Sequence, residues 1–242
     1  MPALQKTNLT NGKPPSEICR ELVNDHGVKR VALSFSAGKD SIAAWLCLRE
    51  AGIEVVPFYF SIFPVELEIE KRIVGFYEDF FKTDVHVYPH PCCYEIFTEL
   101  LFMGPAQVRV MELIGVRDVR SMKWIDSHAS ESLNPGGFTV YGLKKSDSFN
   151  RACVLNKGHI NTKLRKAYPM AYCGDRAVFS LLQAHGCPLP DCYAEIGESL
   201  DSFRIPTMDY IRRKSPSDWE TIKQLQPLIE LEYARQRIST RH

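Results

Sequence analysis

Residues 30–52 predict a buried strand, a short loop and a helix in unbroken succession. The run RVALSF at 30–35 is apolar enough for a strand that is covered on both faces, and 36–41 is a loop of small and charged residues. Residues 42–50 are rich in alanine and leucine, and Gly52 follows where a left-handed helix cap is expected. A loop that leads from a buried strand straight into a helix is typical of open α/β sheets.

The same alternation continues along the chain. Strand and helix in turn predict a parallel, twisted sheet with helices on both faces, a Rossmann-like α/β fold with right-handed crossovers. We expect a flexible arm at 1–15, an α/β domain at 16–200 and a mainly helical extension at 201–242. Further strands are predicted at 54–60, 85–88 and 138–141, and further helices at 65–81, 94–114, 176–185 and 217–237.

The composition narrows the class of protein. Hydrophobic residues make up 45% and charged residues 24% of the 242 residues, and these are globular values. The formal net charge of +1 gives the whole chain no attraction to nucleic acid or to an anionic membrane. Because the first residues lack an apolar signal region and no apolar stretch reaches spanning length, we expect a cytoplasmic protein without membrane contact.

The eight cysteines are scattered and include no CxxC pair. We interpret them as reduced thiols, since a chain of this length needs no disulfide staples. An iron–sulfur cluster built from Cys173, Cys187, Cys192 and a distant fourth thiol is the disfavoured alternative. It stays open because cluster ligands can converge from remote positions.

The loop Ser36-Ala37-Gly38-Lys39-Asp40-Ser41 has the chemistry of an anion site. A helix N-terminus presents unpaired amides and a positive dipole end, and small residues let those amides approach phosphate oxygens. The two serines add hydroxyls and Lys39 adds positive charge. Asp40 suits such a site only when a divalent cation is present, so Mg²⁺ is implied with Asp40 as its ligand. The P-loop of kinases is a different pattern, because Leu33 and Asp40 stand where GxxxxGK[ST] requires Gly and Ser or Thr.

The run SFSAGKDS after a buried strand resembles SGGKDS, the loop of the PP-loop ATP pyrophosphatases, with Ala37 in place of the first glycine. The resemblance implies an adenine nucleotide alpha hydrolase-like fold, with ATP and Mg²⁺ as cofactors. It also implies that the loop holds the pyrophosphate of ATP while the α-phosphorus is attacked, which leaves an adenylylated substrate.

Residues 142–151, GLKKSDSFNR, resemble a segment of the phosphoadenosine phosphosulfate reductase branch of that superfamily. Gly142, Asp147, Ser148 and Arg151 match, whereas Lys144 replaces an arginine and loses its bidentate fork. A looser resemblance covers 168–197 and lacks the tryptophan of the branch. We expect Lys144 and Arg151 to complete a clamp on the polyphosphate.

The predicted site therefore has two sets of residues. Catalytic roles are predicted for Lys39, Asp40, Lys144 and Arg151. Nucleotide contacts are predicted for Ser34, Ser36, Ala37, Gly38, Lys39, Asp40, Ser41, Phe60, Gly142 and Ser148, among which Phe60 would flank the adenine.

The acceptor of the adenylyl group stays open between a small molecule and a nucleic acid. Sulfur transfer, nucleic-acid modification, sulfonucleotide reduction and a non-catalytic nucleotide-binding subunit are the alternatives. Reduction is disfavoured because it needs a thiolate on a C-terminal tail, and 232–242 contain no cysteine. Residues 142–166 hold seven Lys or Arg against one Asp, which could receive nucleic acid, although regularly interleaved aromatic residues are missing.

The predicted helix at 217–237 carries a broad apolar stripe. This stripe would pack either on the core or on a second subunit, so a homo-oligomer is an open alternative. Its members are Ile222, Leu225, Leu228, Ile229 and Leu231.

Overall fold

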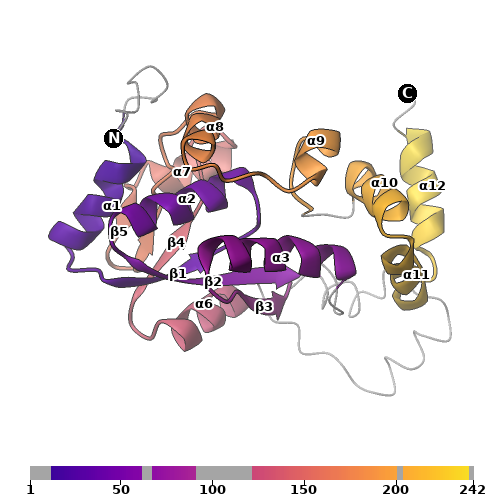
Figure 1. Ribbon diagram of the computed structural model, residues 1–242, viewed down its shortest axis with the longest axis horizontal. Helices are drawn as coiled ribbons and strands as arrows, with labels where there is room; N and C mark the ends of the chain where they lie inside the picture. The colour runs from indigo at the N-terminus through magenta and orange to yellow at the C-terminus, as the bar shows by residue number, and fades with distance from the viewer. Residues whose placement is uncertain (1–11, 62–66, 91–121, 201–203, 240–242) are drawn as a thin grey trace. The chain divides into compact units, whose positions relative to one another are not determined.

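The structure is a computed structural model that describes residues 12–61, 67–90, 122–200 and 204–239 (Figure 1). The helix predicted at 94–114 lies outside the described residues. The N-terminal half contains α1 (Pro15–Asn24), β1 (Arg30–Ser34), α2 (Lys39–Glu50), β2 (Glu54–Ser61), α3 (Glu68–Phe81), β3 (His86–Pro89), α6 (Met122–Leu133) and β4 (Phe138–Tyr141). It is followed by α7 (Phe149–Leu155), β5 (Ile160–Asn161), β6 (Lys166–Ala167), α8 (Asp175–Ala184), α9 (Cys192–Ile196), α10 (Ile205–Lys214), α11 (Pro216–Leu225) and α12 (Ile229–Ser239).

Six strands form one sheet in the order β3-β2-β1-β4-β6-β5. β1 pairs in parallel with β2 and β4, β4 pairs in parallel with β6, and only the pairing of β5 with β6 is antiparallel among the registers described. In Figure 1, α1, α2 and α8 lie on one side of the sheet and α6 lies on the other. The predicted α/β fold, with a mostly parallel sheet and helices on both faces, is confirmed.

The strand order places a switch point beside β1. The chain leaves β1 toward β2 and β3, and it later returns to the opposite side of β1 as β4. Ser34, the last residue of β1, lies beside Phe58 of β2 and Tyr141 of β4. In an open α/β sheet, the crevice at the carboxyl ends of two strands that flank such a reversal is where ligands bind.

α2 is buried almost all the way round, because every residue from Ser41 to Leu48 is covered. It packs against α1, α8 and β1. The ring of Trp45 stacks on Phe81 at 3.9 Å between centroids and meets Phe35 edge-on at 5.2 Å. A helix that is apolar on all sides belongs in the interior of a domain, so the loop before α2 is fixed to a rigid element.

The chain divides into two compact units. The first unit comprises residues up to Tyr59, Tyr77–His86 and Ser127–Pro190, and the second comprises Phe60–Phe76, Val87–Asp126 and Asp191–His242. The first unit contains β1, α2, β4, α7 and α8. The predicted division into 1–15, 16–200 and 201–242 stays a prediction.

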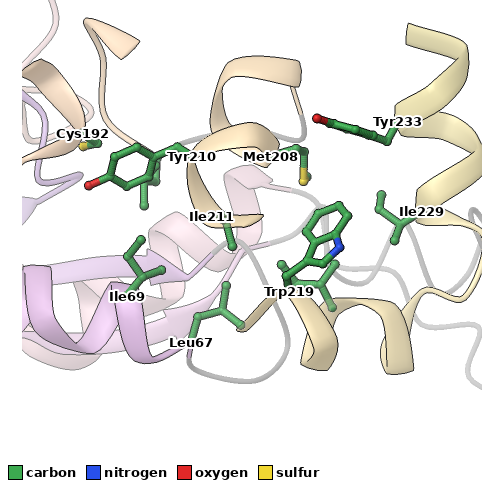
Figure 2. Packing of buried hydrophobic residues seen from close by; sticks show 11 residues of the cluster. Leu67, Ile69, Cys192, Met208, Tyr210, Ile211, Trp219, Ile229 and Tyr233 are labelled. Carbon is green, nitrogen blue, oxygen red and sulfur yellow. The ribbon is translucent and has the colours of Figure 1, made fainter. Parts of the chain in front are cut away.

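The second unit has its own apolar core, drawn in Figure 2. Trp219 of α11 and Tyr233 of α12 meet at 5.9 Å between ring centroids, and Leu67 and Ile69 join them from the start of α3. The buried carboxylate of Asp218 accepts hydrogen bonds from the amides of Glu68 and Ile69, both at 2.9 Å. Asp218 therefore caps the N-terminus of α3.

The structure differs from the predicted elements in two details. The helix predicted over 217–237 is two helices, α11 and α12, that are separated at Gln226 and Pro227. Gln226 has φ −132° and ψ 75°, as expected for a residue that precedes a proline, because the proline ring disfavours a helical conformation there. A second difference is α1, which begins at Pro15 with Pro14 as its N-cap residue, within the arm predicted to be flexible at 1–15.

The interruption also divides the apolar stripe. Ile222 and Ile229 are buried in the core of the second unit, whereas Leu228 and Leu231 are exposed. The homo-oligomer stays a prediction.

Candidate functional site

The loop between β1 and α2 is held in shape by its two serines. The hydroxyl of Ser41 donates to the carbonyl of Gly38 at 2.8 Å, and the amide of Ser36 donates to the Ser41 hydroxyl at 3.3 Å. The amide of Gly38 in turn donates to the Ser36 hydroxyl at 3.3 Å. Because the single hydrogen of the Ser41 hydroxyl is directed to Gly38, this side chain shapes the loop and its predicted contact with a phosphate stays a prediction.

Ala37 has a left-handed backbone conformation, with φ +52°. This conformation costs a residue with a Cβ roughly 1–2 kcal/mol relative to glycine. Ala37 is also almost fully buried. The loop therefore makes at Ala37 a turn for which glycine is the usual residue.

The first turn of α2 presents backbone amides toward the loop. Gly38 is the N-cap residue, and its carbonyl accepts the amides of Ser41 and Ile42. The amides of Lys39 and Asp40 lie in this first turn, ahead of the amides that Gly38 accepts. Together with the positive end of the helix dipole, they give this turn an affinity for anions.

Gly142, the first residue after β4, lies directly against this turn. A Cβ atom on Gly142 would be 2.6 Å from the backbone nitrogen of Ser41 and 2.7 Å from the carbonyl carbon of Asp40. Real Cβ atoms do not come so close to backbone. Glycine therefore allows the carboxyl end of β4 to meet the first turn of α2, and the predicted neighbours Gly142, Asp40 and Ser41 lie together.

Lys144 lies in the midst of three carboxylates. Its ammonium is 3.0 Å from Oδ1 of Asp40 and 3.4 Å from Oδ1 of Asp147, and it donates to Oδ1 of Asp175. The side chain of Lys144 is only 2% exposed. Burial alone would lower the pKa of Lys144, but the carboxylates of Asp175, Asp40 and Asp147 outweigh it and raise the pKa above the ordinary value of 10.5. The ammonium is therefore charged at neutral pH.

Two further cations complete this arrangement. Nζ of Lys39 lies 3.2 Å from Oδ2 of Asp40 and 3.5 Å from Oδ1 of Asp175. Nη1 of Arg151 lies 2.6 Å from Oδ2 of Asp147. Three cations thus alternate with three carboxylates and their formal charges cancel. We call these six residues the charge cluster: Lys39, Asp40, Lys144, Asp147, Arg151 and Asp175.

Ser148 has a structural role in this region. It is the N-cap residue of α7, and its hydroxyl accepts the amide of Arg151 at 3.2 Å. Phe60, the remaining predicted contact, belongs to the second unit, where its ring lies 6.1 Å from that of His90. The predicted contacts of Ser148 and Phe60 with the nucleotide stay predictions.

Two members of the charge cluster were not among the predicted site residues. Asp147 is a match in the resembling segment at 142–151, and Asp175 lies within the looser resemblance at 168–197. Asp175 begins α8 directly after Gly174. An acidic residue in the first turn of a helix is an ordinary capping signal. Nothing in the sequence around Asp175 therefore predicts its contact with Lys144.

The three cysteines proposed as alternative cluster ligands are buried. Burial raises the pKa of Cys173 to about 12 and the pKa values of Cys187 and Cys192 to about 11. Cys173 and Cys187 belong to the first unit, and Cys192 belongs to the second. Across 12–61, 67–90, 122–200 and 204–239, no three His, Cys, Asp or Glu side chains are grouped as a metal site. Within the same ranges, no helix is both long and apolar enough to cross a bilayer.

Comparisons with known proteins were made by sequence and by structure. The sequence matches no protein family and no curated protein. Among solved structures, this chain is similar to an NH3-dependent NAD synthetase from Campylobacter jejuni subsp. jejuni NCTC 11168 in complex with the nitrate ion. The TM-score is 0.46 and the identity 14%, over 93% of this chain and 91% of that chain. Similarity at this level assigns no function to this chain.

Proposed function

We propose that this chain is an ATP-using enzyme of the PP-loop ATP pyrophosphatase superfamily. It would hold the β- and γ-phosphates of ATP on residues 36–41 while an acceptor attacks the α-phosphorus. A bond then forms between the acceptor and that phosphorus, the bond to the β-phosphate oxygen breaks, and pyrophosphate leaves. The observation that carries the proposal is the close approach of Gly142 to the first turn of α2, at the switch point between β1 and β4.

The charge cluster supports a division of roles among its cations. Lys39 is on the first turn of α2, beside the amides that would bind phosphate oxygens. We therefore propose that its ammonium contacts the α-phosphate or the leaving pyrophosphate. Lys144 is enclosed by carboxylates, and we assign it the positioning of Asp40 and Asp175. Arg151 is half-exposed, which leaves its guanidinium accessible to the far end of a polyphosphate.

The implied Mg²⁺ fits the residues present. Asp40 offers one carboxylate that is partly exposed, and Mg²⁺ is usually bound by one or two carboxylates together with phosphate oxygens and water. Asp40 would therefore be its protein ligand, and the nucleotide would supply most of the remainder. When bound, Mg²⁺ would neutralise charge that develops on the leaving pyrophosphate.

Within the superfamily, we place the chain with the phosphoadenosine phosphosulfate reductase-like branch, on the residues 142–151. Adenylyl transfer is preferred to sulfonucleotide reduction, because reduction needs a thiolate nucleophile. The pKa values of Cys173, Cys187 and Cys192 are all raised by burial, so these thiols are protonated at neutral pH. Replacing Cys187 or Cys192 by Ser is expected to leave turnover intact, and loss of turnover in either variant would favour reduction.

The proposal is tested by the products formed from ATP. The protein is incubated with Mg-ATP and candidate acceptors, and AMP with pyrophosphate is separated from ADP with phosphate. AMP and pyrophosphate are expected. Formation of ADP and phosphate would contradict cleavage at the α-phosphorus, and calorimetric ATP binding without turnover would favour the non-catalytic nucleotide-binding subunit.

Two variants connect the products to the loop. Lys39→Ala and Asp40→Ala are each expected to slow pyrophosphate release by more than about tenfold, which corresponds to ~1.4 kcal/mol of lost transition-state stabilisation. Lys82→Ala is the matched control, since Lys82 is exposed and ion-paired with Asp79 at 3.8 Å. Equal rates of pyrophosphate release in all three variants would show that Lys39 and Asp40 do not act in the reaction.

A further inference from the structure

We propose that residues 149–166, here the basic segment, bind a single strand of nucleic acid. The inference rests on the proposed function in one respect, because it names the nucleic acid as the acceptor of the adenylyl group. The binding itself needs no ATP. The observations that carry it are the charge of the segment, its exposure, and its connection to the charge cluster.

The basic segment has cations and no carboxylates. It contains Arg151, Lys157, Lys163, Arg165 and Lys166, and neither Asp nor Glu occurs in it. The whole chain has 30 Lys and Arg against 29 Asp and Glu, so this surplus is local and is compensated elsewhere. A local excess of positive charge in a nearly neutral chain is the electrostatic footprint of a polyanion site.

Three of these cations are available to a ligand. Lys157, Lys163 and Arg165 are exposed. In the part of the chain that the structure describes, no carboxylate lies within 4.0 Å of their charged nitrogens. The charges of these three side chains are thus not neutralised by ion pairs within the described part of the chain. A phosphate backbone would pair with them and release its bound counterions, which favours binding.

The segment is ordered by a small number of contacts. Leu155 is the buried residue of α7, and it packs against Tyr168 and Ala171. The turn between β5 and β6 is closed by the amide of Leu164, which donates to Oδ1 of Asn161 at 2.9 Å. The cations are therefore presented from a folded surface.

The same segment also contains exposed apolar side chains. Phe149 is 81% exposed and Leu164 is 61% exposed. An exposed aromatic ring among cations can stack on an unpaired base, and such stacking tolerates any base sequence. This ring is what favours a single strand over a duplex, whose bases are already stacked on one another.

Protection of a sheet edge does not account for the cations. β5 is the last strand of the sheet, and lysines on such a strand often prevent edge-to-edge aggregation. The two residues of β5, however, are Ile160 and Asn161, which are uncharged. The available cations lie in the flanking turns instead, at Lys157, Lys163 and Arg165.

The basic segment is continuous with the proposed site. Its residue Arg151 contacts Asp147 at 2.6 Å, and Asp147 contacts Lys144 at 3.4 Å. Lys144 contacts Asp40 in the first turn of α2 at 3.0 Å. Arg151 thus lies near the carboxyl end of β4, where the α-phosphorus is expected, whereas Lys163 and Arg165 precede β6 and lie toward the amino end of β4. A strand that contacts all three would run past the edge of the sheet and end at the proposed site, which suits a nucleic-acid acceptor.

The test uses a fluorescein-labelled single-stranded RNA of about 20 nucleotides and mixed sequence, longer than the site of one small binding domain. Anisotropy gives its affinity for the full chain without ATP, at salt concentrations from about 50 to 200 mM. The triple variant Lys157→Glu, Lys163→Glu, Arg165→Glu is expected to bind at least about tenfold more weakly, with a salt slope smaller by about 2. Phe149→Ala is expected to weaken binding about fivefold or more without changing the salt slope.

The matched control is Arg20→Glu, Lys29→Glu, Lys82→Glu, which changes net charge equally at three exposed positions of the first unit. It is expected to keep its affinity within about twofold. Equal losses in both triple variants, or no binding by the natural protein, would overturn the proposal. Tighter binding of a duplex of the same sequence would overturn the assignment of a single strand.

Two further measurements separate this inference from the proposed function. If the first triple variant does not give the circular dichroism spectrum of the natural protein, Lys163→Glu replaces it, because Lys163 lies in the turn after β5 and is exposed. The affinity for Mg-ATP, measured by calorimetry, is expected to be unchanged both in the first triple variant and in Lys163→Glu. RNA binding without ATP binding would support the basic segment as an RNA site and contradict the proposed ATP site. ATP binding without RNA binding would support the ATP site and contradict the RNA site.

Discussion

The ammonium of Lys144 lies 3.0 Å from a carboxylate oxygen of Asp40, and the two residues come after β4 and β1, which pair in parallel. Asp40 is in the first turn of α2, and Lys144 follows β4. The ion pair thus joins the two chain segments that flank the switch point. It places the buried ammonium of Lys144 against the carboxylate of Asp40 in the first turn of α2.

Replacing Lys144 by Met is expected to lower the free energy of unfolding by about 2–3 kcal/mol. The substitution keeps much of the side-chain volume but removes the buried cation that Asp40, Asp147 and Asp175 share. The three carboxylates would then keep only Lys39 and Arg151 as partners and would repel one another more strongly. The value lies below that of a fully buried pair because Asp175 is 61% exposed. Urea unfolding measures the change, and Lys82→Met is the exposed control. A loss no larger than that of the control would contradict the structural role of Lys144.

Stability is expected to depend on pH through Asp175. The pKa of Asp175 is below its ordinary value of 3.8, chiefly because Lys144 donates a hydrogen bond to the carboxylate. The ionised carboxylate therefore stabilises the fold above pH 3.8, and this contribution is lost as the pH falls from 3.8 through the lower pKa of the folded state. Urea unfolding at decreasing pH should show a smaller loss for Asp175→Asn than for the natural protein. The exposed control Asp84→Asn should follow the natural protein, and identical curves for all three would refute the coupling.

A methyl group on Gly142 is expected to separate β4 from the loop. Its Cβ would lie 2.6 Å from the backbone of Ser41, so the first turn of α2 must shift. Gly142→Ala should weaken Mg-ATP binding by at least about tenfold, since misplaced amides lose their contacts with phosphate. Calorimetry measures this affinity. Gly75→Ala is the same change at a helical position with no atom within 4 Å, and it should leave the affinity unchanged.

The cap on α3 is expected to be a strong determinant of stability in the second unit. Asp218→Ala removes the acceptor of two amides and of the Ser215 hydroxyl, which donates at 2.6 Å. The expected cost is about 3 kcal/mol, because the lost bonds are charge-assisted and buried. Urea unfolding followed by circular dichroism measures it. Glu220→Ala, on the exposed face of the same helix, should cost less than ~0.5 kcal/mol, and a similar value for Asp218→Ala would argue against the cap.

The central strand, the loop and its helix could be predicted because local patterns determine them. Six apolar residues, a loop of small residues and a helix-forming run carry their own periodicity, so β1, α2, β2 and β4 lie where they were expected. Gly142 was predicted as a nucleotide contact because it matches the resembling segment at 142–151. The two-residue strands β5 and β6 were missed, because so short a run has no periodicity to detect.

The charge cluster could be predicted only in part. Lys39, Asp40, Lys144 and Arg151 were chosen for their chemistry and position in the chain. The contact of Lys144 with Asp175 joins residues 31 positions apart, and it depends on how α8 packs on α2. No local pattern records such a tertiary contact. The break at Pro227 was missed for a different reason, because a regular apolar stripe on both sides outweighed the proline in the prediction.

The cap of α3 by Asp218 has a consequence for synthesis on the ribosome. Glu68 and Asp218 are 150 positions apart, so the segment that carries Leu67 and Ile69 emerges long before its partners. At ordinary elongation rates of about 5–20 residues per second, this interval lasts roughly 10–30 s. For that time the nascent chain carries an uncovered apolar segment, which is the kind of surface that chaperones engage.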